Sequence, residues 1–323
     1  MRREGSAWSG VGIVFLKELS DHLSSVRMRV LEWLVVITGI AAVYSAIQQI
    51  REVTAEDPFL FLRLFTRAGG QLPLSFVSLL SFLVPLVAIG LGFDLVNSEH
   101  NQRTLSRILA QPIYRDALLF GKFLAGLATI AIGLLALWLF VIGLGLLLLG
   151  VPPSGEELAR ALVILAVTIV YAGVWLALAI LFSIVFRSAA TAALVSLGLW
   201  LFLTILWPPL SQFLAAAVAT GPVTSAGELL GQLDTLQAFA RLSPGELYGE
   251  VVAVVLDPSV RSTQQTLLAS MGLALVERGA IPGALPLLQS VLIVWAQIVS
   301  LVAATILLFV VGYVVFQRQE VRA

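Results

Sequence analysis

The stretch FLAGLATIAIGLLALWLFVIGLGLLLLG, residues 123–150, is almost entirely apolar and contains no charged side chain. The hydrocarbon core of a bilayer is about 30 Å thick, so a helix needs about 20 apolar residues to cross it. These residues exceed that length without interruption. The stretch is therefore predicted to be a transmembrane helix, and it sets the fold class of the chain.

Five further stretches meet the same criterion, namely Trp33–Ile50, Leu72–Val96, Ala161–Phe186, Ala189–Leu210 and Leu287–Phe316. The composition agrees, since 59% of the residues are hydrophobic, 12% are charged and the mean hydropathy is +1.00, whereas soluble domains are about one-quarter charged. We therefore predict an all-α, polytopic membrane protein with six transmembrane helices in a single domain, residues 1–323. The formal net charge of zero argues against a nucleic-acid partner.

The basic residues are distributed unequally between the two sides of this six-helix map. Cytoplasmic loops concentrate Arg and Lys near membrane spans. Twelve Arg and Lys residues fall on the side that carries both termini and seven on the other side. Both termini are therefore predicted to be cytoplasmic, in a protein of the plasma membrane.

Two segments outside the spans show helix signals of their own. Residues 9–30 repeat apolar side chains at three- and four-residue steps, with Lys17, Glu18 and Asp21 on the other face, which predicts an amphipathic elbow helix at the membrane interface. Residues 211–286 are too long for an unstructured connection. Ser243-Pro244-Gly245-Glu246 has the pattern of a capping box. This segment is predicted to form a small helical cap on the extracytoplasmic side, between the fifth and sixth spans.

A charged stretch, SEHNQRTLSRILAQPIYRDALLFGK (residues 98–122), separates the second and third predicted spans. An acidic residue, Thr-Leu, a Leu-rich turn, Pro, a basic residue and Gly-Lys follow one another along it, here as Glu99, Thr104-Leu105, Ile108-Leu109, Pro112, Arg115 and Gly121-Lys122. With its flanking spans, this pattern resembles the first intracellular loop of ABC-2 type transporter permeases, such as those of copper-enzyme maturation and of drug or lipid export. It departs from the family at Arg103, where many members have Gly. Residues 242–262 are also similar to a segment of one ABC-2 subgroup.

The resemblance implies that residues 97–122 form a cytoplasmic loop that couples the chain to ABC ATPase subunits. The residues that would carry the coupling are Glu99, Arg103, Thr104, Leu105, Arg107, Ile108, Leu109, Pro112 and Arg115. The resemblance also implies a second permease subunit, identical or homologous, and ATP and Mg bound by the separate ATPase. Gly121-Lys122 lacks the upstream Gly of a phosphate-binding loop. This chain is therefore expected to hold no cofactor and to be no enzyme.

The polar residues inside the predicted spans are few and uncharged. Ser75, Ser78 and Ser81 recur at three-residue steps, Tyr171 lies mid-span, and Gln297 lies in the last span. Such groups usually bond to a neighbouring helix, and the alternative is that they line a translocation path. Because no ionisable residue lies well inside a span, we expect an apolar or amphiphilic cargo that enters from the membrane lipids.

The predicted function is therefore the permease subunit of an exporter. One alternative is a membrane scaffold that binds an extracytoplasmic accessory protein through residues 211–286. Another is a metal or copper-enzyme maturation transporter, although no His or Met cluster has metal-ligand spacing. An intramembrane protease is disfavoured, because Asp94 lacks a second carboxylate inside a span with which to share a proton.

Overall fold

A computed structural model describes residues 7–26, 28–29, 33, 36–37, 39–41, 43–44, 46, 59–66, 75–98, 115–150, 152–218, 226–264 and 284–318. Every regular element within these ranges is a helix, as predicted. The elements are α1 (Ala7–Ser24), α3 (Arg63–Thr66), α4 (Phe76–Gly92), α7 (Arg115–Leu149), α8 (Gly155–Val185), α9 (Ala189–Leu201), the π-helix η1 (Phe202–Leu206), α10 (Trp207–Val218), α11 (Ala226–Ala240), α12 (Pro244–Leu256), α14 (Leu287–Ile293) and α15 (Trp295–Arg318).

Four helical stretches are long and apolar enough to cross a membrane: Asp116–Leu149, Gly155–Val185, Ala189–Val218 and Trp295–Arg318. They overlap the predicted third to sixth spans, so the chain is a multi-pass membrane protein. The predicted second span contains α4, an apolar helix of 17 residues. Half of the residues of the predicted first span, Trp33–Ile50, are described, and these are helical. The count of six spans therefore stays a prediction.

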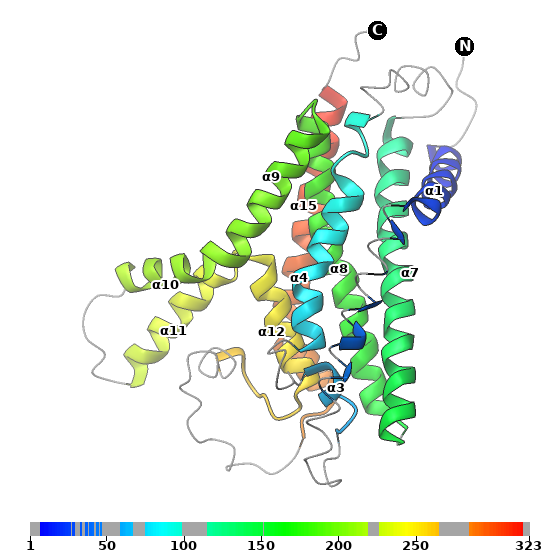
Figure 1. Cartoon of the computed structure of the whole chain (residues 1–323). Helices are drawn as coiled ribbons and strands as arrows, with labels where there is room; N and C mark the ends of the chain where they lie inside the picture. Colours follow the sequence, from blue (N-terminus) through cyan, green and yellow to red (C-terminus); the bar gives the residue numbers. More distant parts are fainter. Residues whose placement is uncertain are drawn as a thin grey trace, which may run out of the picture.

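Helix α8 is the centre of the bundle. It packs against α4, α7, α9, α12 and α15, and Figure 1 shows it surrounded by these helices. All ten residues from 171 to 180 are buried. A Cβ added to Gly92 of α4 would lie 2.7 Å from the Cβ of Ala179 in α8. The absence of a side chain at Gly92 therefore allows the close helix contact that small residues provide in membranes.

The end of α4 is fixed to α8 by a side-chain hydroxyl. The backbone N–H groups of Val96 and Asn97 donate to Ser183 Oγ at 3.0 and 3.2 Å. Both groups lie beyond the last turn of α4, where backbone donors need partners other than the helix. Ser183 thereby holds the chain in place just before residues 99–114, which lie outside the described residues.

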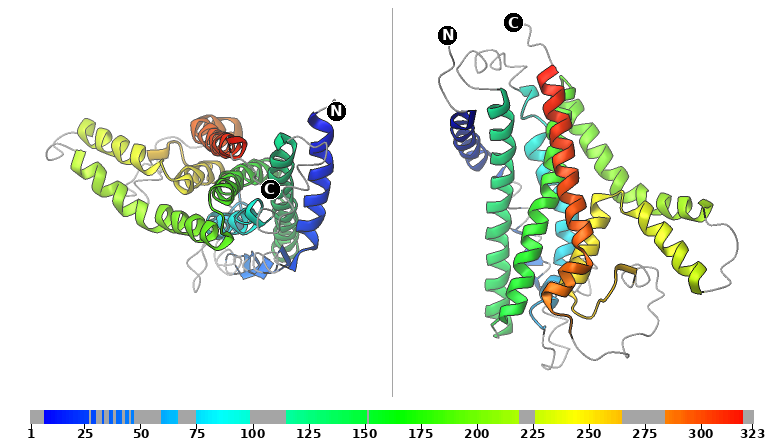
Figure 2. Two further views of the ribbon diagram at one scale, coloured as in Figure 1. Left: turned by 90° about the horizontal axis from the view of Figure 1, so that it is seen from above. Right: turned by 180° about the vertical axis from the view of Figure 1, so that it is seen from behind.

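Helix α1 lies across the bundle beside α7 rather than along it (Figure 2, left). It shares one end of the bundle with the last turns of α15 (Figure 1), and we call this the α1 end. The opposite end carries α3 and the turn before α8 (Figure 1), and we call it the α3 end. Helix α1 covers most of residues 9–30, and their assignment as an interfacial elbow helix stays a prediction.

Two predicted spans differ from the helices in the structure. The sixth is interrupted at Val294, whose φ of −109° and ψ of 14° end α14 before α15 begins. The fifth runs through the π-helix η1 into α10, and Pro208 and Pro209 lie in the first turn of α10. π-helical turns and Pro are common causes of helix kinks. Accordingly, α10 turns away from the direction of α9 (Figure 1).

The predicted segment 211–286 is helical in its described parts. Helices α10 and α11 pack against each other and form an arm that projects from the bundle (Figures 1 and 2). Helix α12, in contrast, contacts α4, α8 and α15. It runs from about mid-height of the bundle towards the α3 end (Figure 1). This segment therefore contributes one helix to the interior of the bundle, which the prediction of a cap did not anticipate.

Candidate functional site

A cavity of about 320 Å³ opens between α4, α8, η1 and α12. It contains three of the five residues that the sequence indicates for a translocation path. Its lining consists of Ser78, Leu79, Ser81, Phe82, Tyr171, Leu203, Thr204, Ser243, Gly245 and Glu246. Ser78, Phe82 and Thr204 are exposed, whereas Tyr171 and Ser243 are buried. The first three residues therefore form the mouth of the cavity and the last two form its floor.

The floor is held by two stacked tyrosines. The rings of Tyr171 and Tyr248 lie 4.5 Å apart with an interplanar angle of 8°. The Tyr171 hydroxyl donates to the carbonyl oxygen of Ser81 at 3.0 Å, and the Tyr248 hydroxyl lies 2.9 Å from Thr168 Oγ1. Buried aromatic pairs of this kind pack rigidly and need a partner for each hydroxyl. The floor therefore ties α4, α8 and α12 into one unit.

The predicted capping box at the start of α12 does not form. Ser243 is the N-cap and Pro244 follows it as predicted, but the Ser243 side chain makes no capping bond. Its hydroxyl donates instead to the carbonyl oxygen of Leu203 in η1, at 3.3 Å. The backbone N–H of Ser243 donates to the carbonyl oxygen of Ala240. The Glu246 side chain therefore cannot accept from this N–H, as a capping box requires. Glu246 lines the cavity instead.

The next acidic residue of α12, Glu250, has a different environment. Its carboxylate accepts two bonds from Arg241 Nε, at 3.0 and 3.1 Å, and one from Gln297 Nε2 at 2.6 Å. Gln297 thus bonds to a neighbouring helix and is absent from the cavity lining. Ser75, the fifth candidate, caps α4 by accepting from the N–H of Ser78 at 3.2 Å. The structure therefore brings together Ser78, Ser81 and Tyr171, and separates Gln297 from them.

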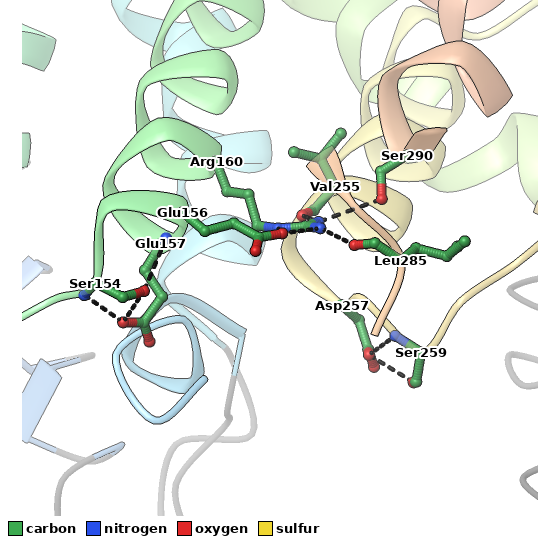
Figure 3. A network of polar contacts seen from close by, with 9 residues as sticks. All are labelled: Ser154, Glu156, Glu157, Arg160, Val255, Asp257, Ser259, Leu285 and Ser290. Carbon is green, nitrogen blue, oxygen red and sulfur yellow. Dashed lines mark hydrogen bonds and ion pairs between the residues drawn. The ribbon is translucent and has the colours of Figure 1, made fainter. Parts of the chain in front are cut away.

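A buried arginine links the helices at the α3 end. Arg160 of α8 is fully buried, and its guanidinium donates to Glu156 Oε1, to Ser290 Oγ and to the carbonyl oxygens of Val255 and Leu285 (Figure 3). These partners lie on α8, on α12 and on the segment that leads into and includes α14. A buried charge is tolerated when its donors are satisfied in this way. Arg160 therefore fixes α12 and α14 to α8.

A capping box does form one turn before Arg160. The Ser154 side chain accepts from the N–H of Glu157 and the Glu157 side chain accepts from the N–H of Ser154 (Figure 3). The same carboxylate accepts from the backbone N–H of Phe61 at 2.8 Å. The spacing Ser154-x-x-Glu157 matches the sequence pattern of this motif. That pattern is the signal that could have located the start of α8.

The α1 end contains a buried ion pair between α1 and α7. Lys122 Nζ lies 2.9 Å from Glu18 Oε1, and the two side chains are 3% and 8% exposed. Glu18 therefore lies against α7, whereas the sequence predicts it on the polar face of the amphipathic helix, away from the apolar contacts. Burial alone would raise the pKa of Glu18, but Lys122 and Lys17 outweigh it and lower the pKa below its usual 4.5. Burial lowers the pKa of His22, one turn further along α1.

Gly121 explains how α1 approaches α7 so closely. A Cβ at this position would lie 2.6 Å from Cγ1 of Val14 in α1. The pair Gly121-Lys122 thus has two structural functions, because the glycine admits α1 and the lysine binds Glu18. Residues 115–122 belong to α7. The other residues predicted to couple to an ATPase, Glu99, Arg103, Thr104, Leu105, Arg107, Ile108, Leu109 and Pro112, lie outside the described residues.

Residues 13–321 match the family described as ABC-2 family transporter protein. The chain belongs to this family. A stretch of 139 residues is 32% identical to a protein of Pseudomonas aeruginosa described as the probable ABC transporter permease protein NosY, over 41% of this chain and 48% of that protein. The chain therefore spans about half the length of this curated relative. The recognition based on residues 98–122 is confirmed.

Proposed function

We propose that this chain is the permease subunit of an ABC-2 type exporter for an amphiphilic or hydrophobic cargo. The family match over residues 13–321 carries the permease part of this proposal, and the membrane-length helices support it. The cargo class rests on the lack of ionisable residues well inside the predicted spans. The same match favours a transporter over a scaffold. ATP and Mg would be bound by separate ATPase subunits, and a second permease, identical or homologous, would complete the complex.

The α1 end is the expected docking side for the ATPase. The ion pair between Glu18 and Lys122 joins α1 to the first turns of α7, which directly follow the predicted coupling residues. A force applied to residues 99–114 would therefore reach both α1 and α7. From α7 it would pass to α8, with which α7 is in contact, and so to the cavity.

ATPase binding tests this proposal. The permease with Arg103→Glu and Arg107→Glu is expected to retain ATPase subunits at least about tenfold less than the native chain, because lost or reversed ion pairs at a protein contact weaken binding. The measurement is the ratio of ATPase to permease after co-purification from native membranes. The matched control is Arg51→Glu with Arg67→Glu, two arginines predicted for the opposite side. Full ATPase recovery with the first double variant would contradict the coupling function of these arginines.

The orientation of the chain gives a separate prediction. The protein has no cysteine, so single cysteine variants provide a clean background. Ser106→Cys is expected to react with an impermeant thiol reagent only from the cytoplasmic side, and Ser262→Cys only from outside, because the Arg and Lys distribution places them on opposite sides. Labelling of intact cells and of inverted vesicles measures both. Reaction of both variants from one face would reject the six-span map.

A further inference from the structure

We propose that the cavity between α4, α8, η1 and α12 is a binding site for a protonated amine with an apolar chain, and that the Glu246 carboxylate is its counter-charge. The proposal rests on the transport function proposed above, because it specifies the chemistry of the cargo. The binding step itself involves only this chain.

The first step of the argument is the unequal pairing of two acidic residues on α12. Glu250 is bound by Arg241 and Gln297. Glu246, one turn earlier, is partly buried and has neither a hydrogen-bonding nor an ion-pairing partner in the part of the chain that the structure describes. A carboxylate that is partly removed from water and has no partner loses part of its hydration energy without compensation. A cation that binds beside Glu246 removes this cost.

The second step is the polarity of the lining. Besides Glu246, the lining includes the hydroxyl residues Ser78, Ser81 and Thr204, of which Ser78 shares a hydrogen bond with Ser75 at 2.8 Å, and the apolar residues Leu79, Phe82 and Leu203. An ammonium group has three N–H donors and no acceptor, so a carboxylate together with hydroxyl oxygens satisfies it. The aromatic ring of Phe82 at the mouth can contact both the cation and its chain. The lining therefore fits a cationic head with an apolar tail.

The third step concerns the competing ligands. An anion would meet Glu246, and like charges in a partly dry site repel strongly. Arg241, which belongs to the turn before α12, is occupied by Glu250. A neutral alcohol could use the hydroxyl groups but would leave Glu246 unpaired. The volume of about 320 Å³ is at the lower end of the range of roughly 300–1,000 Å³ for small-molecule sites, which favours a compact head group.

Binding of octylamine to the purified full-length chain in detergent tests the proposal. Equilibrium dialysis at neutral pH separates saturable binding of radiolabelled octylamine from its partition into micelles. Octan-1-ol and octanoate, which have the same chain length, serve as competitors. We expect octan-1-ol to bind at least about tenfold more weakly than octylamine, a difference of about 1.4 kcal/mol, and octanoate not to compete.

The variants localise the site. Glu246→Gln should lower octylamine affinity about tenfold and leave octan-1-ol affinity nearly unchanged. The matched control is Glu228→Gln, an exposed acid on α11, which should change neither affinity. Thr204→Trp at the mouth should abolish binding of both ligands while keeping Glu246. Thr204→Trp also serves as a second test of the site if Glu246→Gln does not yield a monodisperse protein.

Three results would overturn the proposal: no saturable octylamine binding, equal binding of octylamine and octan-1-ol, or unchanged octylamine binding in Glu246→Gln and in Thr204→Trp. Because the assay contains no ATPase, these results would leave the permease function standing. Conversely, intact ATPase binding by the Arg103 and Arg107 double variant would contradict the coupling function and would leave the octylamine result unaffected. The two proposals can therefore fail separately.

Discussion

Replacing Arg160 by Leu is expected to lower the free energy of unfolding by about 3–5 kcal/mol, the usual effect of removing one partner from a buried charged network. The guanidinium is fully buried, and it donates to the carbonyl oxygens of Val255 and Leu285. Leucine fills part of the volume but leaves both acceptors without a donor. Each such buried acceptor costs about 1–3 kcal/mol.

The measurement is the thermal stability of the purified chain in detergent, read from the temperature at which half of it loses its monodisperse form. Arg187→Leu is the matched control, because Arg187 is exposed just beyond the opposite end of α8. Arg160→Lys should give an intermediate loss, since an ammonium keeps the charge but cannot reach all four partners. If Arg160→Leu unfolds at the same temperature as Arg187→Leu, the network at the α3 end does not hold α12 and α14 to α8.

The sequence predicts the helices well because their signals are local. Apolar stretches of membrane length need no knowledge of their neighbours, and the predicted third to sixth spans overlap the four membrane-length helices. The start of α12 at Ser243 and Pro244 is confirmed for the same reason. The interruption at Val294 was not predicted, since no Gly, Pro or polar residue marks it in the sequence.

The side-chain pairings could not be predicted because their partners are distant in the sequence. The sequence places Arg160 just before the predicted span Ala161–Phe186, on the side opposite the termini, and does not indicate that its partners include Leu285 and Ser290. Glu246 matched a local capping pattern that assigned it a backbone partner. The structure instead uses that backbone N–H within the preceding turn. The position of Glu246 in the cavity lining therefore follows only from the packing of α12 beside α4 and α8.

Breaking the ion pair between α1 and α7 is the second change with a large expected effect. Lys122→Met leaves the Glu18 carboxylate buried, with Lys17 at 3.1 Å as its remaining partner. We expect a loss of about 3–5 kcal/mol in the free energy of unfolding. The double variant Lys122→Met with Glu18→Gln should recover much of this loss, because two neutral side chains replace the buried carboxylate that has lost Lys122. A double-mutant cycle on thermal stability measures the coupling.

The pH dependence of the same variants gives an independent check. The folded pKa of Glu18 lies below its usual 4.5 because of Lys122 and Lys17. Its contribution to stability is therefore complete above the unfolded pKa and is lost as the pH falls through the folded pKa. Burial also lowers the pKa of His22 from 6.5, so its protonation destabilises the fold in the same direction, and a His22→Gln background removes this contribution. In that background, the native pair should lose more stability below about pH 4.5 than the double variant does. Equal acid sensitivity of the two proteins would show that the Glu18–Lys122 pair does not fasten α1 to α7.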